Sequence, residues 1–101
     1  MRITGIQEMI RSGKYRVSEH AVKRMIEKRI ERNEVIEAIM SGEIIEEYPT
    51  DKYSPSCLIY GNSNAGRDLH VLVSLPPNVI IITTYPPEPE GWINYRTRRC
   101  A

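Results

Sequence analysis

The fold depends most on the stretch DLHVLVSLPPNVIIITTY, which covers residues 68–85. Two β-rich runs, residues 68–74 and 79–85, flank the turn residues Pro76-Pro77-Asn78. Side chains alternate between the two faces of a strand, so the first run separates into two sets. Leu69, Val71 and Val73 form one set, and His70, Leu72 and Ser74 form the other. The pattern predicts two antiparallel strands joined by a tight turn.

The same alternation in the second run predicts that Val79, Ile81, Thr83 and Tyr85 share a face. Two further strands are expected at residues 43–48 and 57–60, before this pair. A turn-forming loop at 49–55 and a Gly- and Asn-rich loop at 61–66 separate the strands. Strands joined by short loops favour an antiparallel meander.

Helical periodicity precedes the strands. Residues 2–12 predict a short amphipathic helix that ends at Gly13, and Ser18 is a good N-cap for a second helix. A third helix runs to about Met40, with Glu31 or Asn33 at its start. The predicted fold class is therefore α+β, with about three N-terminal helices packed on a C-terminal four-stranded antiparallel sheet.

The length of 101 residues predicts a single domain, residues 1–101. We divide it into a helical part (1–42), an antiparallel sheet (43–85) and a Pro-rich and basic C-terminal tail (86–101). In the tail, residues 86–91 are too rich in proline for a regular helix or strand. Trp92 is expected to anchor the tail on the body of the protein.

Composition limits the function classes. The net charge of +1 argues against tight nonspecific binding of nucleic acid but leaves room for a local basic patch. Cys57 and Cys100 lack the spacing of a zinc site, and no apolar run approaches the roughly 18 residues of a membrane helix. With no apolar leader at the start, we expect a cytoplasmic protein without metal, small-molecule cofactor or membrane association.

A line of basic residues is the first candidate functional feature. His20, Arg24 and Lys28 are spaced i, i+4 and i+8 on the second predicted helix, which places them along one line. If this helix packs near the edge of the sheet, they share a shallow cleft with His70, Thr83 and Tyr85. The sequence does not fix the pairing register of the last two strands, so it leaves open which of Thr83 and Tyr85 lies on the same face of the sheet as His70.

Such a set suits RNA cleavage without a metal. Histidine or tyrosine can remove and return protons, and Arg24 and Lys28 can stabilise charge on phosphoryl oxygens. His20, Arg24, His70 and Tyr85 are therefore the candidate catalytic residues, and Lys28 is a candidate RNA-binding residue. Both histidines also fit ordinary structural roles, since a histidine in a half-buried strand commonly satisfies local hydrogen bonds.

Arg96, Arg98 and Arg99 form a second candidate RNA-binding group, because guanidinium groups bind phosphate oxygens in pairs of hydrogen bonds. The alternative for these three arginines is a solvated, frayed terminus.

Several segments, taken in order, resemble the small prokaryotic family known as domain of unknown function 4258. They are Ser18-Glu19-His20-Ala21, Arg24-Met25, residues 35–39, residues 42–49, Ser56-Cys57-Leu58-Ile59, residues 69–73, and residues 82–89 before Trp92. The family's His-x-x-x-Arg pattern corresponds to His20 and Arg24, its strand histidine to His70, and its Thr-x-Tyr to Thr83 and Tyr85.

The family is similar in size and layout to RelE/BrnT-like toxins of prokaryotic toxin–antitoxin pairs, which implies a RelE-like layout here. The resemblance implies a cytoplasmic toxin component, a metal-independent endoribonuclease, with a zinc-finger-type antitoxin protein as partner and RNA as substrate. The alternatives are a protein-binding module without catalysis and an RNA-binding module that does not cleave.

Two departures from the family concern the second and third helices. Lys28-Arg29-Ile30 replaces the family's Arg-Gly-Ile, which changes how the second helix ends. Glu31 replaces the usual Thr or Ser cap before the third helix.

Overall fold

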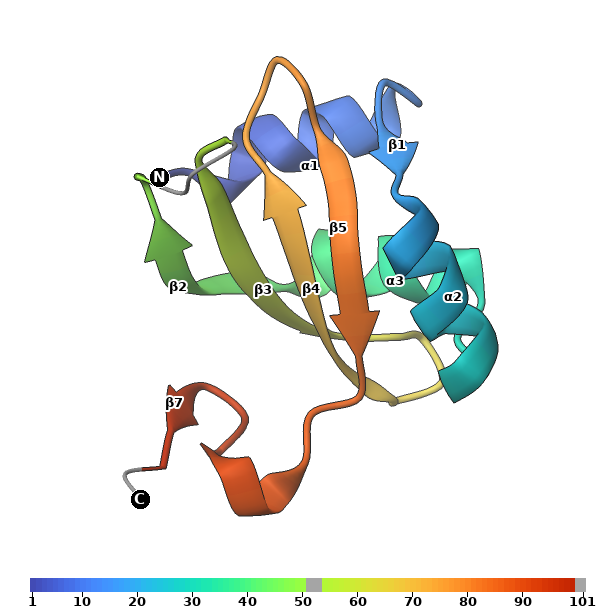
Figure 1. The fold of residues 1–101 in the computed structure, drawn as a ribbon, viewed down its shortest axis with the longest axis vertical. Helices are drawn as coiled ribbons and strands as arrows, with labels where there is room; N and C mark the ends of the chain where they lie inside the picture. Colours follow the sequence, from blue (N-terminus) through green and yellow to red (C-terminus); the bar gives the residue numbers. More distant parts are fainter. Residues whose placement is uncertain (51–53, 100–101) are drawn as a thin grey trace.

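The computed structural model describes residues 1–50 and 54–99. Three helices and a five-stranded sheet form the body, and a small two-stranded ribbon follows (Figure 1). Their bounds are α1 (Ile3–Arg11), β1 (Arg16–Val17), α2 (Glu19–Lys28), α3 (Arg32–Ser41), β2 (Glu43–Tyr48), β3 (Ser56–Asn62), β4 (Asp68–Ser74), β5 (Ile80–Tyr85), the 3₁₀ turn η1 (Pro89–Gly91), β6 (Trp92–Ile93) and β7 (Thr97–Arg98). Asp51 and Lys52 of the predicted loop, and Cys100, lie outside the described residues.

The prediction of a four-stranded antiparallel sheet is wrong. The main sheet has five strands in the order β1-β5-β4-β3-β2, and β1 runs parallel to β5. Arg16 N–H donates to the Val79 carbonyl and Ser18 N–H to the Ile81 carbonyl, each at 3.0 Å. A strand of two residues has no alternation that periodicity could detect, so the sequence shows only a short extended piece there.

Local hydrogen bonds explain where the helices begin and end. Ser18 caps α2, as predicted, because its Oγ accepts the Ala21 N–H at 3.0 Å. At the other end of α2, Arg29 adopts the left-handed backbone (φ 54°), a conformation that glycine adopts more readily. The guanidinium of Arg67 donates to the carbonyls of Lys28 and Arg29, at 2.7 and 2.8 Å, and so satisfies this helix end.

The core lies between the sheet and the helices α1 and α3, which cover one face (Figure 1). Val71 and Val73 are fully buried there, together with Ile59 of β3. The contact between α3 and β3 is especially close at Gly61. A Cβ atom at this position would overlap the backbone carbonyl of Ala38, so only glycine allows the two elements to pack.

The expected face pattern of the last strand is wrong at one point. A β-bulge shifts the β4–β5 pairing, so Leu72 pairs with Thr83 but Val73 pairs with Ile81. Ile81 therefore faces the core, whereas Thr83 and Tyr85 share the opposite face with Leu72 and His70. The bulge is the reason why residues of the last strand could not be assigned to faces by simple alternation.

The C-terminal tail folds back onto the helix-free face of the sheet. Trp92 is buried, and its ring packs edge-on against His70 at 4.4 Å between centroids, which confirms its predicted anchoring role. The Pro-rich segment forms only the single turn η1, but β6 and β7 then pair as an antiparallel ribbon that the sequence did not predict.

Candidate functional site

The basic line on α2 and the last strand of the sheet meet at one hollow. His20, Arg24 and Lys28 line it together with Thr83 and Tyr85 of β5, and Pro86 and Glu88 complete it. The hollow has a volume of about 390 Å³ and opens to solvent. The spacing along α2 places His20, Arg24 and Lys28 at the hollow, and the β-bulge places Thr83 and Tyr85 on the face that borders it. Four of the predicted site residues therefore converge with Thr83 at this hollow, whereas His70, the sixth residue of the predicted cleft, does not line it.

His70 does not line this hollow. It is 0% exposed, and both ring nitrogens have partners: Nε2 lies 2.7 Å from the Tyr95 carbonyl oxygen and Nδ1 lies 3.2 Å from the Tyr85 hydroxyl. A carbonyl only accepts, so Nε2 carries the proton and Nδ1 accepts from Tyr85. Burial lowers the pKa of His70, although the Tyr95 carbonyl and Glu46 act in the opposite direction. The imidazole is therefore neutral at pH 7 and sits directly behind Tyr85.

Tyr85 is half-buried between His70 and the hollow. Its register partner in β4 is His70, so both side chains lie on the helix-free face, with ring centroids 5.3 Å apart. Burial raises the pKa of the Tyr85 phenol. Tyr85 therefore keeps its proton at neutral pH and can act as a proton donor.

The three tail arginines lie outside the hollow, and each has a partner within the chain. Arg96 pairs with Glu43 and stacks over the Tyr60 ring. Arg98 donates to Glu46 at 2.8 and 3.2 Å and stacks over the Trp92 ring at 4.7 Å, while Arg99 donates to the Pro89 carbonyl. The structure thus gives these predicted RNA-binding residues an intramolecular role, and it puts Arg98 at the border of a second hollow.

Glu46 is the acidic counterpart of Arg98 on the helix-free face. Burial raises its pKa, but hydrogen bonds from Arg98 and Tyr48 outweigh burial, and the pKa lies below its ordinary value. The Glu46 carboxylate therefore stays charged and fixes the position of Arg98 above the sheet.

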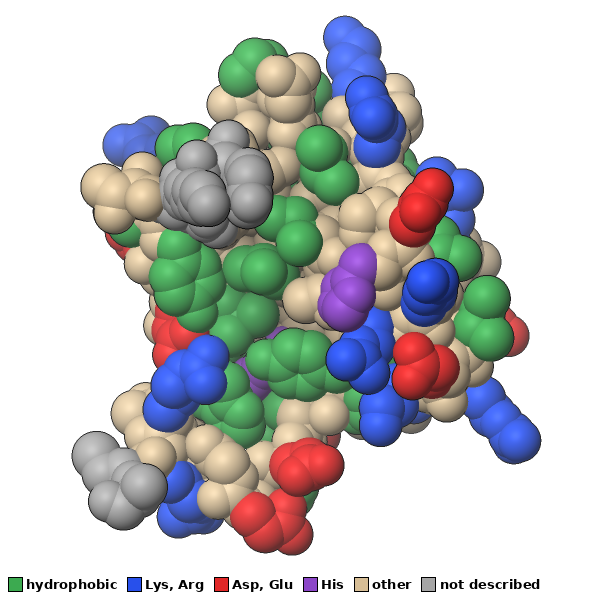
Figure 2. Space-filling view, in the orientation of Figure 1, with side chains coloured by type: hydrophobic (Ala, Val, Ile, Leu, Met, Phe, Trp, Pro, Cys, Tyr) green, Lys and Arg blue, Asp and Glu red, His purple; other side chains and the backbone are tan. Residues whose placement is uncertain are grey.

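Figure 2 shows hydrophobic side chains gathered on the helix-free face over the sheet, with Lys and Arg side chains along the α2 side. Sequence reasoning missed Glu88, which adds a carboxylate to the basic hollow. It also missed the Tyr95 carbonyl as the partner of His70. A backbone group in an irregular tail leaves no signal in the sequence.

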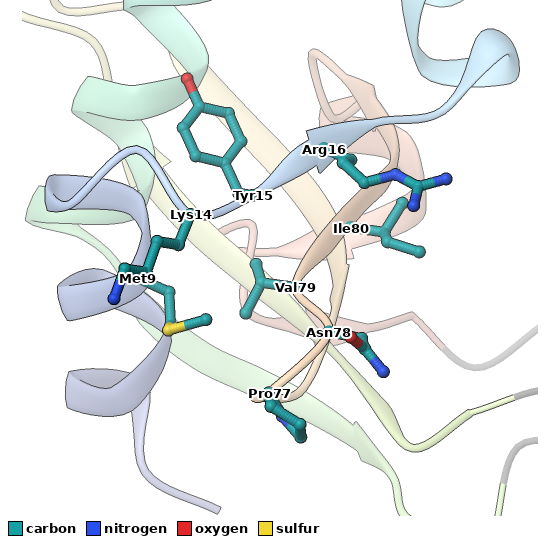
Figure 3. Close-up of a pocket in the computed structure, with 8 residues that line it drawn as sticks. All are labelled: Met9, Lys14, Tyr15, Arg16, Pro77, Asn78, Val79 and Ile80. Carbon is teal, nitrogen blue, oxygen red and sulfur yellow. The ribbon is translucent and has the colours of Figure 1, made fainter.

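A larger hollow of about 590 Å³ lies elsewhere, between α1 and the β4–β5 turn (Figure 3). Met9, Val79 and Ile80 give it apolar walls, and Lys14 and Arg16 add positive charge. It holds neither a histidine nor a carboxylate, so it offers no acid–base pair. Cys57, the one cysteine among the described residues, is fully buried, and burial raises the pKa of its thiol to about 11.

Within residues 1–50 and 54–99, no three His, Cys, Asp or Glu side chains gather as a metal-binding group. No helix in this part of the chain is long and apolar enough to cross a membrane.

These features define a small α+β protein with a basic hollow where one helix meets the last strand of its main sheet. The model of the family described as domain of unknown function (DUF4258) matches residues 17–86, and the chain belongs to this family. The matched segment contains His20, Arg24, Lys28, His70 and Tyr85. No curated protein and no solved structure matches the chain.

Proposed function

We propose that this protein is a metal-independent endoribonuclease of the RelE/BrnT-like toxin type, acting on RNA in the cytoplasm. The observation that supports it is the convergence of His20, Arg24 and Lys28 with Tyr85 around one solvent-open hollow. It joins two groups that exchange protons to two groups that bind phosphate, which is the minimum set for cleavage of RNA by its own 2′-hydroxyl.

The reaction assigns a role to each residue. The 2′-oxygen attacks the adjacent phosphorus while His20, as a neutral imidazole, takes the 2′-hydroxyl proton. The P–O5′ bond breaks, and Tyr85 gives its phenolic proton to the leaving O5′ atom. The products are a 2′,3′-cyclic phosphate and a free 5′-hydroxyl. Arg24 and Lys28 hold the phosphoryl oxygens, where negative charge grows in the transition state.

His70 acts through Tyr85 rather than on RNA. It is buried with both nitrogens engaged, so it is a positioning residue in this proposal. The Tyr85–His70 contact of 3.2 Å is longer than a typical hydrogen bond of a hydroxyl group, so the hydroxyl can turn toward a substrate.

RNA cleavage in EDTA, followed by analysis of the fragment ends, tests the proposal. Fragments ending in 2′,3′-cyclic phosphate are expected from the wild type, and Tyr85→Phe should cleave about 10²- to 10⁴-fold more slowly. Lys28→Gln should weaken cleavage, whereas Lys23→Gln, on the same helix but outside the hollow, should not. Absence of cleavage with both free RNA and ribosome-bound messenger RNA would refute the proposal.

A second candidate function is protein binding, with a zinc-finger-type antitoxin as partner. Its supporting observation is the apolar surface of α2, where Ile26 is 72% and Val22 44% exposed beside a hollow of about 250 Å³. Exposed apolar side chains grouped on one helix are typical of interaction surfaces. Co-expression with a zinc-finger protein encoded beside this chain, with Ile26→Asp as the disrupting variant, tests this candidate independently of cleavage.

A further inference from the structure

An apolar groove on the helix-free face adjoins the basic hollow and has no role in the cleavage chemistry. It has a volume of about 260 Å³ and is lined by Tyr48, Leu58, Leu72, Thr83, Tyr85 and Arg98. Its lining is mostly apolar, in contrast to the neighbouring hollow with its histidine and two cations.

The strand register explains the shape of the groove. Leu58 pairs with Leu72, and Leu72 pairs with Thr83, so these three side chains form one row across β3, β4 and β5. Tyr48 comes from the row on one side, because its partner is Ser56. Tyr85 comes from the row on the other side. The groove thus has an aliphatic floor with a tyrosine ring at each of two ends.

Arg98 forms a rigid part of the rim. Its guanidinium is held by two hydrogen bonds to Glu46 and by the Trp92 ring beneath it. A guanidinium plane and tyrosine rings are the surfaces on which unpaired bases of RNA stack. Because Arg98 is already held in place, little side-chain freedom is lost when a ligand binds there.

Thr83 and Tyr85 line both the groove and the basic hollow, so one ligand can occupy both. Such a ligand carries an anionic group for Arg24 and Lys28 and a flat, weakly polar group for the groove. A nucleotide of single-stranded RNA has both parts, joined at a short distance. An apolar peptide side chain would fill the groove but would offer no anionic group to Arg24 and Lys28 in the hollow.

We propose that the groove is a nucleobase subsite, which stacks the base next to the phosphate held by Arg24 and Lys28. The subsite deepens the proposed function and rests on it for the position of the phosphate. Base binding can be measured without cleavage, so the two proposals fail separately. The preference is for unpaired RNA, because a base inside a duplex cannot reach the floor formed by Leu58 and Leu72.

The experiment measures binding of a short single-stranded oligonucleotide whose 2′-hydroxyl groups are replaced by hydrogen, which prevents cleavage. It carries the fluorescent base 2-aminopurine, and a matched oligonucleotide has an abasic site at that position. Quenching of the fluorescence on binding, and at least fivefold weaker binding of the abasic oligonucleotide, are the expected results.

Tyr48→Leu removes one stacking ring but keeps an apolar side chain. Loss of a base–aromatic stack should weaken binding about 5- to 150-fold and reduce the quenching. Tyr48→Phe keeps the ring and loses only the hydroxyl, which contacts Glu46 and Arg98, so it should bind within about twofold of the wild type. Tyr15→Leu, in the hollow near α1, is the matched control and should bind like the wild type.

Equal affinity of the wild type for the abasic and the base-containing oligonucleotide would overturn the subsite, even if RNA cleavage is observed. Quenching that depends on the Tyr48 ring, in a protein that cleaves no RNA, would support the subsite and refute the nuclease proposal. Unchanged oligonucleotide binding by Tyr48→Leu, with loss of binding to a purified protein partner, would identify the groove as a protein-binding site and overturn the base assignment.

Discussion

Replacing His70 by phenylalanine should lower the free energy of unfolding at pH 7.5 and should remove the pH dependence that His70 gives to this free energy. The phenyl ring fills nearly the same space between Trp92 and Tyr85 but makes neither hydrogen bond. The Tyr95 carbonyl loses its Nε2–H donor. Leaving a buried acceptor without a partner costs about 1–3 kcal/mol, so we expect His70→Phe to be less stable than the wild type by this amount at pH 7.5.

Below pH 6.5 the difference between wild type and variant should shrink. Burial lowers the pKa of His70 in the folded state, so the unfolded chain binds a proton at this residue more readily. Stability contributed by the neutral imidazole is therefore complete above the unfolded pKa of about 6.5 and is lost as the pH falls. The slope is at most about 1.4 kcal/mol per pH unit, and His70→Phe should lack it.

Urea unfolding at several pH values between 5 and 7.5 measures both effects, with the fluorescence of the single tryptophan, Trp92, as the signal. His20→Gln is the matched control, because it removes the exposed histidine and leaves the contribution of His70 in place. A wild type whose stability is constant over this range, or a His70→Phe variant with the wild-type slope, would refute the reasoning.

Three other predictions concern packing and charge. Gly61→Ala should lower the free energy of unfolding by about 3 kcal/mol or more, because the added Cβ overlaps the Ala38 carbonyl. Thermal unfolding measures this loss, with Gly91→Ala as the control, because a Cβ at Gly91 meets open space. An unchanged melting temperature for Gly61→Ala would contradict the close packing of α3 on β3. Glu88→Gln removes a negative charge from the basic hollow and should tighten binding of a short RNA about two- to fivefold, as measured by fluorescence anisotropy. Arg24→Gln should reduce the slope of log affinity against log salt by about 0.7, and an unchanged slope would show that this cation makes no phosphate contact.

The sequence predicted the parts of the site that depend on regular spacing. Three basic residues at intervals of four lie on one line of any α-helix, and His20, Arg24 and Lys28 do line one hollow. The face of Tyr85 could not be predicted, because it depends on the bulge between the Leu72 and Val73 pairings. One extra residue in a strand exchanges the two faces beyond it, and neither Ile81 nor Ile82 has a side chain that marks a bulge.

The sheet could be predicted only in part for a similar reason. β2 to β5 were expected near their observed positions because each contains several consecutive β-forming residues between turn formers. β1 has two residues, and its pairing with β5 depends on the backbone groups of Arg16 and Ser18 rather than on side chains. Backbone hydrogen bonding of this kind is available to almost any sequence.

The buried state of His70 depends on a segment far from it in the sequence. The family match covers residues 17–86, which include His70 and Tyr85, but the groups that enclose the imidazole come from the tail: the Trp92 ring and the Tyr95 carbonyl. The carbonyl holds the proton on Nε2, so Nδ1 is left as an acceptor for the Tyr85 hydroxyl. The part of the tail from Trp92 onward therefore orients the phenol of the candidate site without lining the hollow. A change in the β6–β7 ribbon should alter the chemistry of Tyr85 through His70 and through the charge of Arg98.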